Sequence, residues 1–87
     1  MMAKNTVDQY KRHKVTDIDF HGKSVLDAIR EVKKIIDDTR IKRETRYYNF
    51  ITGRGEINNM IKNTLDAHFI VYSSIPHNPG LIMVEVE

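Results

Sequence analysis

The sequence contains no cysteine. This absence excludes disulfide bonds, thiolate metal sites and a cysteine nucleophile, and it fits a reducing compartment such as the cytoplasm, the localisation that we expect. Long hydrophobic runs are missing too. No apolar stretch approaches the roughly 18 residues of a membrane span, and the first residues lack the apolar core of a signal peptide. We therefore expect no membrane partner.

The length and charge of the chain suit one small domain. Its 87 residues are 40% hydrophobic and 30% charged, an ordinary globular composition, and the net charge is only +2. The cations are unevenly placed, with four against one acid in residues 1–14 and again in residues 40–46. Such clusters suit phosphate contacts, although a solvated tail and loop would look the same. We interpret residues 1–14 as a basic N-terminal tail and residues 15–87 as the domain.

The hydrophobic pattern predicts a regular succession of elements. Residues 15–21 alternate, with Ile18 and Phe20 on one face and Asp19 and His21 on the other, which is typical of a strand with one buried face. Ser24 followed by Asp27 forms a capping box that starts a helix ending near residue 39. The later elements are predicted as a strand over 47–51, a turn over 52–55, a helix over 57–68 and strands over 69–75 and 81–86, the last two joined by a turn over 76–80.

This order, β-α-β-α-β-β, predicts an α/β fold of the α+β two-layer sandwich kind. The first three strands are joined through helices and are therefore expected to run parallel, while the final hairpin makes the fourth antiparallel. A mixed four-stranded sheet with two helices on one face is the economical packing. We expect the first or the fourth strand to form an exposed edge.

Two short sequences close the first and second predicted strands. They are Asp19-Phe20-His21-Gly22 and Thr52-Gly53-Arg54-Gly55. Ligands gather beyond the carboxyl ends of parallel strands, and each of these turns also opens a helix whose free N–H groups favour an anion. The sequence therefore predicts a phosphate held between the two turns.

The pair Asp19 and His21 offers an acid and an imidazole. A carboxylate can fix the tautomer of a nearby imidazole, which can then move protons for a nucleophilic hydroxyl or a leaving oxygen. The same pair could instead ligate a divalent metal such as Mg²⁺ that activates water. A third interpretation is that the pair only orders the end of the strand.

The second turn offers backbone and charge. Glycines such as Gly53 and Gly55 let backbone approach a phosphate closely, and the guanidinium of Arg54 can bind it with two hydrogen bonds. A plain strand-to-helix turn would also use these glycines. Before this turn, Tyr47 and Tyr48 alternate, so one ring is expected in the core and the other is a candidate for stacking on bases.

The combination of the two turns resembles the Smr (small MutS-related) domain family. Ile18-Asp19-Phe20-His21-Gly22, with Ser24 and Asp27-Ala28 after it, resembles the family's strand end and capped helix. Thr52-Gly53-Arg54-Gly55 resembles its Thr-Gly-x-Gly turn, and Leu81–Val86 its closing strand. The resemblance covers residues 15–87.

The resemblance implies a fold similar to the C-terminal domain of translation initiation factor three and endonuclease activity on DNA or RNA. It implies Asp19 and His21 as the catalytic pair and Gly53, Arg54 and Gly55 as the phosphate-facing motif. The neighbouring residues expected to contact substrate are Gly22, Lys23, Thr52, Arg43 and Arg46. Nucleic acid is thus the expected partner, and a monomer is the default state.

The sequence departs from the family pattern just after the second turn. Glu56-Ile57-Asn58-Asn59 stands where many members carry a glycine-containing segment, and the Glu56 carboxylate would compete with a phosphate at the helix start. Three hypotheses therefore remain open: an endonuclease, a nucleic-acid or ribonucleoprotein binding module that does not cut, and a protein-interaction domain.

Overall fold

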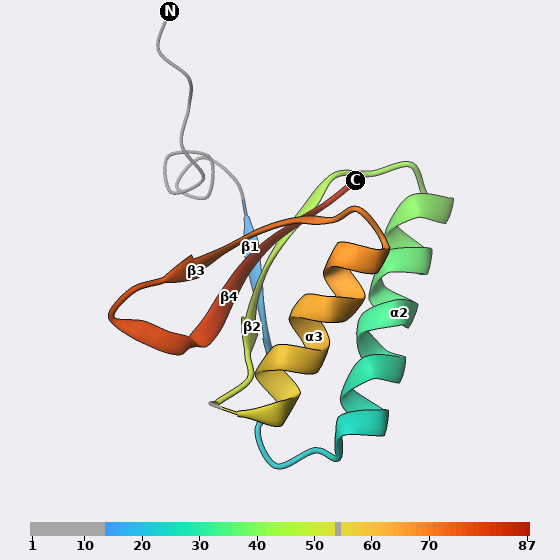
Figure 1. Cartoon of the computed structure of the whole chain (residues 1–87). Coiled ribbons are helices and arrows are strands. Elements are labelled where there is room, and N and C mark those ends of the chain that lie inside the picture. The colour runs from blue at the N-terminus through green and yellow to red at the C-terminus, as the bar shows by residue number, and fades with distance from the viewer. Residues whose placement is uncertain (1–13, 54) are drawn as a thin grey trace, which may run out of the picture.

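A computed structural model describes residues 14–53 and 55–87, so the predicted tail lies outside the described residues except for Lys14. The elements are β1 (Val15–Asp19), α2 (Val25–Ile41), β2 (Arg46–Ile51), α3 (Glu56–Ala67), β3 (Val71–Ile75) and β4 (Asn78–Val86) (Figure 1). The predicted β-α-β-α-β-β order is confirmed. None of these described helices is long and apolar enough to cross a bilayer.

The four strands form one mixed sheet in the order β1-β2-β4-β3. β1 and β2 pair in parallel, and β4 runs antiparallel to both of its neighbours, so β1, β2 and β3 all point the same way, as predicted. Of the two strands named as a possible edge, β1 lies at one, whereas β4 lies between β2 and β3. Its run of apolar residues explains the position, since Ile82 and Val84 are buried on one face and Met83 on the other.

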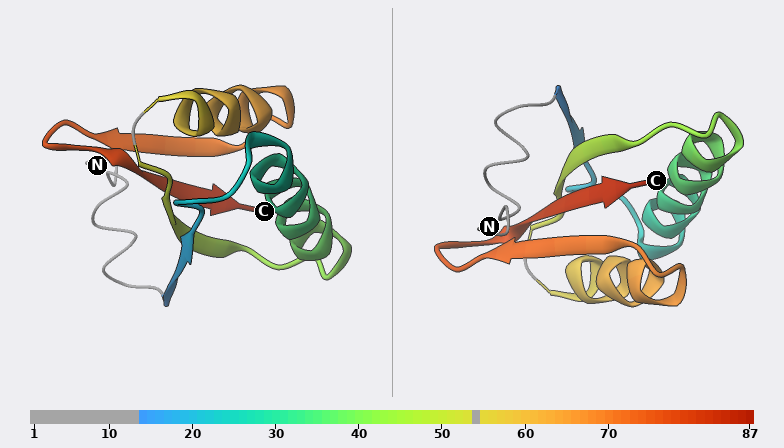
Figure 2. Two further views of the ribbon diagram at one scale, coloured as in Figure 1. Left: turned by 90° about the horizontal axis from the view of Figure 1, so that it is seen from below. Right: turned by 90° about the horizontal axis from the view of Figure 1, so that it is seen from above.

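Both helices cover the same face of the sheet (Figure 2), which confirms the two-layer architecture. The core between the layers is built from the apolar faces of the helices and the inward residues of the strands. Phe20 and Phe50, both fully buried, meet edge to face with ring centroids 5.1 Å apart. Phe20 therefore anchors the end of β1 in the core, directly beside the first predicted turn.

The opposite face of the sheet carries a small second cluster. Tyr47 and Met83 are buried there, with Val15 and Ile75 packed against them, while Tyr48 belongs to the main core. Tyr47 is 7% exposed and Tyr48 6%. The expectation that one tyrosine ring stays free for stacking is therefore wrong, because each face of β2 buries one ring.

Several element boundaries differ from the prediction. β1 ends at Asp19, so His21 lies in the turn, and α2 continues to Ile41. β3 begins only at Val71, because Phe69 has a left-handed backbone with φ of +58° that no strand can include. β4 begins at Asn78, which leaves a hairpin turn of two residues instead of five.

Candidate functional site

The two predicted turns lie side by side at one edge of the sheet. In the parallel β1–β2 pair, Asp19 is in register with Ile51, and the Phe20 amide donates to the Ile51 carbonyl at 2.8 Å. Neighbouring strands are about 4.8 Å apart, so the two strands deliver their turns to the same place. The structure thus brings Asp19, His21 and Gly22 next to the turn that begins at Thr52.

The first turn exposes both members of the acid–imidazole pair. Asp19 Oδ1 accepts a hydrogen bond from the backbone N–H of His21 at 2.9 Å, and it lies 4.0 Å from His21 Nδ1. The His21 side chain is 79% exposed and that of Asp19 60%. The carboxylate therefore fixes the backbone of the turn and stays near the ring without a hydrogen bond to it, and the imidazole is open to a ligand.

Gly22 and Lys23 complete the first turn. The Lys23 amide donates to the Phe20 carbonyl at 3.1 Å, and Gly22, at the third position of this turn, has φ of +83°. That value favours glycine, as in a type II turn. Lys23 extends its ammonium to Glu31 on α2 at 3.3 Å, so this predicted substrate contact is engaged in an ion pair.

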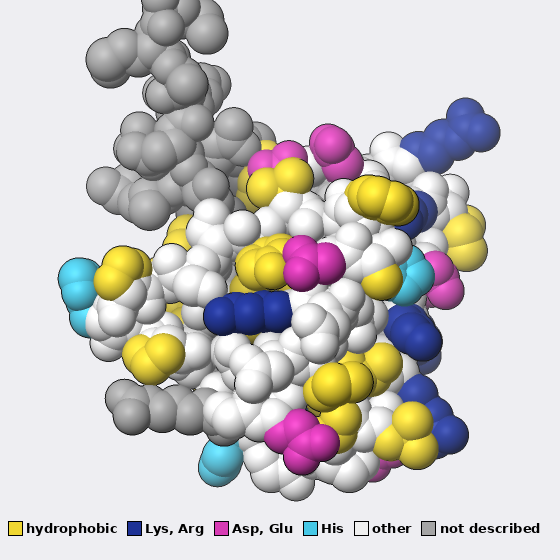
Figure 3. All heavy atoms as spheres, viewed as in Figure 1, with side chains coloured by type: hydrophobic (Ala, Val, Ile, Leu, Met, Phe, Trp, Pro, Cys, Tyr) yellow, Lys and Arg dark blue, Asp and Glu magenta, His cyan; other side chains and the backbone are white. Residues whose placement is uncertain are grey.

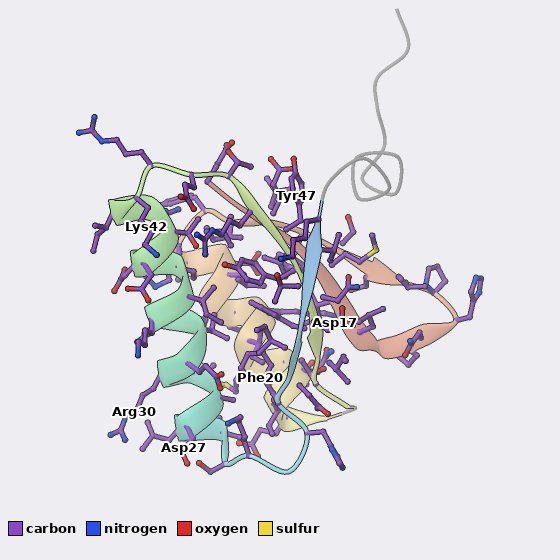
Figure 4. The ribbon with its side chains drawn as sticks, turned by 180° about the vertical axis from the view of Figure 1, so that it is seen from behind. Asp17, Phe20, Asp27, Arg30, Lys42 and Tyr47 are labelled. Atoms are coloured by element: carbon purple, nitrogen blue, oxygen red, sulfur yellow. The ribbon has the colours of Figure 1, made fainter. Side chains whose placement is uncertain are left out.

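The start of α2 follows the predicted capping. Ser24 is the N-cap, and its hydroxyl accepts from the Asp27 amide at 3.1 Å. Figure 4 shows Asp27 at this end of α2 and Lys42 at the other end, with Phe20 between β1 and the helix. The cap and the buried ring together hold the first turn from both sides.

The second turn leaves its backbone open. Gly53 and Gly55 have φ of +68° and +100°, and no heavy atom lies within 4 Å of a Cβ built on either residue. Gly55 is also the N-cap of α3 and provides no side-chain cap, so the first amides of α3 lack a side-chain partner at the cap. Free N–H groups at a helix start attract anions.

Thr52 holds the second turn from inside. It is 3% exposed, its amide donates to the Gly80 carbonyl at 2.8 Å, and its hydroxyl lies 2.8 Å from the Gly53 carbonyl oxygen. The hydroxyl also accepts a hydrogen bond from Asn58 Nδ2 at 2.9 Å. The structure therefore places Thr52 behind the turn as a positioning residue, although the sequence predicts it as a substrate contact.

Two further positioning residues were missed by sequence reasoning. Asn58, 7% exposed, joins the turn to β4 by donating to Thr52 and to the Pro79 carbonyl at 3.0 Å. A Cβ on Gly80 would stand 3.1 Å from the Gly53 Cα, so glycine lets β4 pass the turn without displacing its backbone. A polar residue on the inward face of the α3 pattern was the available signal for Asn58.

The charge of the described part of this edge is not basic. Glu56 is exposed in the first turn of α3, and Asp17 on β1 accepts a hydrogen bond from Asn49 Nδ2 at 3.0 Å. Figure 4 shows Asp17 on the side of β1 away from α2. Arg54, the cation expected in the second turn, lies outside the described residues.

Arg43 and Arg46 lie at the opposite end of the sheet. Arg46 begins β2 while Thr52 follows its end, which separates the two by roughly 20 Å of strand. Arg46 is bound by Glu44, whose carboxylate lies 2.5 Å from Nη2; this hydrogen bond is the main reason that the pKa of Arg46 is raised above its usual value. A hollow of about 400 Å³ at this end is lined by Lys14, Thr16, Thr45, Arg46 and Tyr47. The structure does not bring these residues to the two turns.

The described residues offer little to a metal ion. Within residues 14–53 and 55–87, no group of three or more His, Cys, Asp or Glu side chains is placed to hold one. The Asp19–His21 pair supplies two donors.

The sheet order, the helices on one face and the paired turns define an Smr-like domain fold. The sequence matches no protein-family model and no curated protein. The structure resembles the crystal structure of the Smr domain of Thermus thermophilus MutS2, with a TM-score of 0.68 over 83% of this chain and 98% of that one. The two sequences are 18% identical, so this likeness shows the fold.

Proposed function

We propose that this chain is a nucleic-acid endonuclease of the Smr type that cleaves phosphodiester bonds where β1 and β2 end. One observation carries the proposal: an exposed imidazole beside a carboxylate lies next to an open glycine turn that starts a helix. The likeness to the Smr domain of a MutS2 protein supports nucleic acid as the partner. Cytoplasmic localisation belongs to the same proposal.

In the proposed reaction, His21 moves protons. Its imidazole takes the proton from the attacking oxygen, a 2′-hydroxyl in RNA or a water for DNA, while the bond from phosphorus to the leaving oxygen breaks and that oxygen takes a proton from solvent water. Asp19 holds the turn through the His21 amide, and its carboxylate lies 4.0 Å from the ring. RNA requires less of the protein, because its own hydroxyl attacks.

The second turn stabilises the charge that develops on the phosphate. The amides of Gly53 and Gly55 and the start of α3 can point N–H groups at the phosphate oxygens, where charge grows in the transition state. Arg54 adds a guanidinium to the same turn. Gly22 lets the first turn approach the phosphate closely, since no atom lies within 4 Å of a Cβ at this position.

The test is cleavage of end-labelled DNA and RNA by the wild-type chain and by His21→Ala. We expect His21→Ala to lose at least about 100-fold in rate, the usual contribution of a general acid or base. His77→Ala is the matched control, because His77 is an exposed histidine in the β3–β4 turn. Equal cutting by His21→Ala and wild type would refute the catalytic role of His21. Activity retained in EDTA would exclude a metal-dependent mechanism.

One observation favours a second candidate, a binding module that does not cut. Glu56 places a carboxylate in the first turn of α3, at the position where a phosphate would bind. If the chain is such a binding module, Glu56→Gln raises its affinity for nucleic acid. The wild-type chain then binds nucleic acid with an affinity that falls steeply with salt, and it forms no cleavage product. Product formation by the wild type, lost in His21→Ala, would instead support the endonuclease.

A further inference from the structure

The glycine turn after β2 is held by a chain of side-chain hydrogen bonds that starts on β4. The Asn58 side chain donates from Nδ2 to the Pro79 carbonyl at 3.0 Å and to the Thr52 hydroxyl at 2.9 Å. The Thr52 hydroxyl lies 2.8 Å from the Gly53 carbonyl oxygen and 3.2 Å from that of Gly80. The chain of hydrogen bonds therefore runs from the start of β4 to the backbone of the turn.

The direction of each of these hydrogen bonds follows from the groups that make it. A carbonyl oxygen only accepts, so the Asn58 atom facing Pro79 is the nitrogen, whose two N–H groups serve Pro79 and Thr52. The Thr52 oxygen accepts from Asn58, and its single hydrogen must go to a carbonyl. Gly53 offers the nearer one, and the Gly80 carbonyl already accepts the Thr52 amide at 2.8 Å. Asn58 thereby commits the Thr52 hydroxyl to donate to Gly53.

The hydrogen bond to Gly53 fixes the orientation of one peptide group. Thr52 is 3% exposed, so the Gly53 carbonyl that accepts its hydrogen is turned toward the interior. In a planar trans peptide the C=O and the N–H point in opposite directions, so the N–H of this peptide group is turned outward. A carbonyl oxygen turned outward would instead repel a phosphate at the turn.

The described side chains around the two turns are not basic, which makes the backbone N–H groups decisive. Asp19 and Glu56 are exposed, and Lys23 is paired with Glu31. Figure 3 shows acidic and basic side chains interspersed on the face of the molecule that carries the helices. An N–H group binds an anion only when it points at it, so the orientation of the turn controls its affinity for phosphate.

We propose that Asn58 and Thr52 hold the Gly53 carbonyl inward and so turn the N–H of the same peptide group toward the bound phosphate. Both are positioning residues, because they act through the backbone of Gly53 and do not touch the substrate. This inference rests on the proposed function, which binds a phosphate at this turn. It makes the start of β4 part of the site, since the Pro79 carbonyl fixes the direction of the Asn58 amide.

The test titrates inorganic phosphate into the ¹⁵N-labelled chain and obtains the dissociation constant from the amide shifts of Gly53 and Gly55. Thr52→Val keeps the shape of the side chain and removes its hydroxyl. This variant should bind phosphate at least about 10-fold more weakly, the loss expected for one hydrogen bond to a charged group. Thr52→Ser keeps the hydroxyl and should bind like the wild type.

A second buried threonine controls for the loss of stability. Thr39, near the end of α2, is 1% exposed, and its hydroxyl donates to the Ile35 carbonyl at 2.8 Å. Thr39→Val should lower the melting temperature as Thr52→Val does, because each removes a buried hydroxyl from a carbonyl. Thr39→Val should leave the phosphate affinity unchanged, which a general loosening of the fold would not do.

Asn58→Asp tests the direction of the hydrogen bonds in the chain without ligand. A carboxylate accepts and does not donate, so it draws the Thr52 hydrogen away from Gly53. The ¹³C shift of the Gly53 carbonyl should therefore move upfield in both Asn58→Asp and Thr52→Val. If Asn58→Asp does not fold, the comparison of Thr52→Val with Thr52→Ser still decides.

Three results would overturn the proposal. These are equal phosphate affinities of Thr52→Val and wild type, an equal loss in Thr39→Val, and an unchanged Gly53 carbonyl shift in Thr52→Val. Absence of any phosphate-induced shift at Gly53 and Gly55 in the wild type would overturn the phosphate site and this proposal with it. Equal cutting by His21→Ala and wild type concerns only the catalytic role of His21, so the two failures are distinguishable.

Discussion

At the scale of single residues, the candidate site divides into groups that face outward and groups that hold them. His21, Asp19, Gly22 and Gly55 are exposed, whereas Thr52 and Asn58 are buried behind the turns. Asn58 joins the second turn to β4 because its side-chain amide donates to both Thr52 and Pro79. In the proposed function, the exposed groups bind or react, and the buried ones hold the second turn through their hydrogen bonds.

Asn58→Ala should destabilise the chain and loosen the second turn. Removing the side chain leaves the Pro79 carbonyl and the Thr52 hydroxyl without this donor, at a cost of about 1–3 kcal/mol. Urea unfolding followed by circular dichroism measures the loss. Asn59→Ala, an exposed position one residue further on, should lie within about 0.5 kcal/mol of wild type. Equal stabilities of the two variants would show that the Asn58 hydrogen bonds do not hold the turn.

At the scale of elements, β2 is the strand on which the rest depends. It pairs with β1 in parallel and with β4 in antiparallel, and it buries Tyr48 on the helix side and Tyr47 on the other. Its two ends carry different chemistry, with Arg46 at its start and the glycine turn after its end. A change at one end of β2 therefore acts on a different surface from a change at the other.

Tyr47, on the outer face of β2, should make the stability of the chain depend on pH. Burial raises the pKa of the Tyr47 phenol above its ordinary 10.0, and Glu85 and Glu87 raise it further. The unfolded chain thus loses this proton first, so the stabilisation is complete below about pH 10 and is lost as the pH rises through the higher pKa of the folded state.

Tyr47→Phe should reduce the loss of stability that the chain shows as the pH rises through this range. Melting temperatures at pH 8 and pH 10.5 are compared for wild type and variant, and the wild type should lose more stability between the two pH values. The comparison uses the difference between pH values, so any loss of stability common to both of them cancels. Identical decreases in the two proteins would contradict a raised pKa for Tyr47.

At the scale of the whole molecule, the length of α2 separates the turns after β1 and β2 from the ends of the helices by about 25 Å. The turns after β1 and β2 lie at the helix starts, and Arg43 and Phe69 lie at the helix ends. The proposed reaction therefore lies at one end of the molecule, at the helix starts.

The sequence allowed much of this layout to be predicted. Alternation in β1 and helical spacing in α2 gave the buried faces, and parallel crossovers predicted that the two glycine-bearing turns would meet. These features depend on local pattern. The position of β4 did not follow from the hairpin, because pairing with β2 instead of the sheet edge is a long-range choice. Its unbroken apolar run was the only local indication.

Other features could not be predicted from the local sequence pattern, because they depend on contacts between segments that are far apart in the chain. Alternation placed Tyr47 and Tyr48 on opposite faces but could not show that both faces of β2 are covered. Phe69 fits the pattern of a strand, and its left-handed conformation arises from the end of α3, which depends on Ile70 reaching the core. Gly80 matters only because β4 passes Gly53, a contact between segments far apart in the chain.

The central claim is that the turns after β1 and β2 form one phosphate-facing site. Amide chemical shifts of the ¹⁵N-labelled chain, titrated with a short oligonucleotide, test it most directly. The account predicts that the amides of His21, Gly22, Gly53 and Gly55 shift together with one half-saturation concentration, and that Glu56→Gln moves it lower. Shifts confined to other parts of the chain, or separate half-saturation concentrations for the two turns, would contradict the claim.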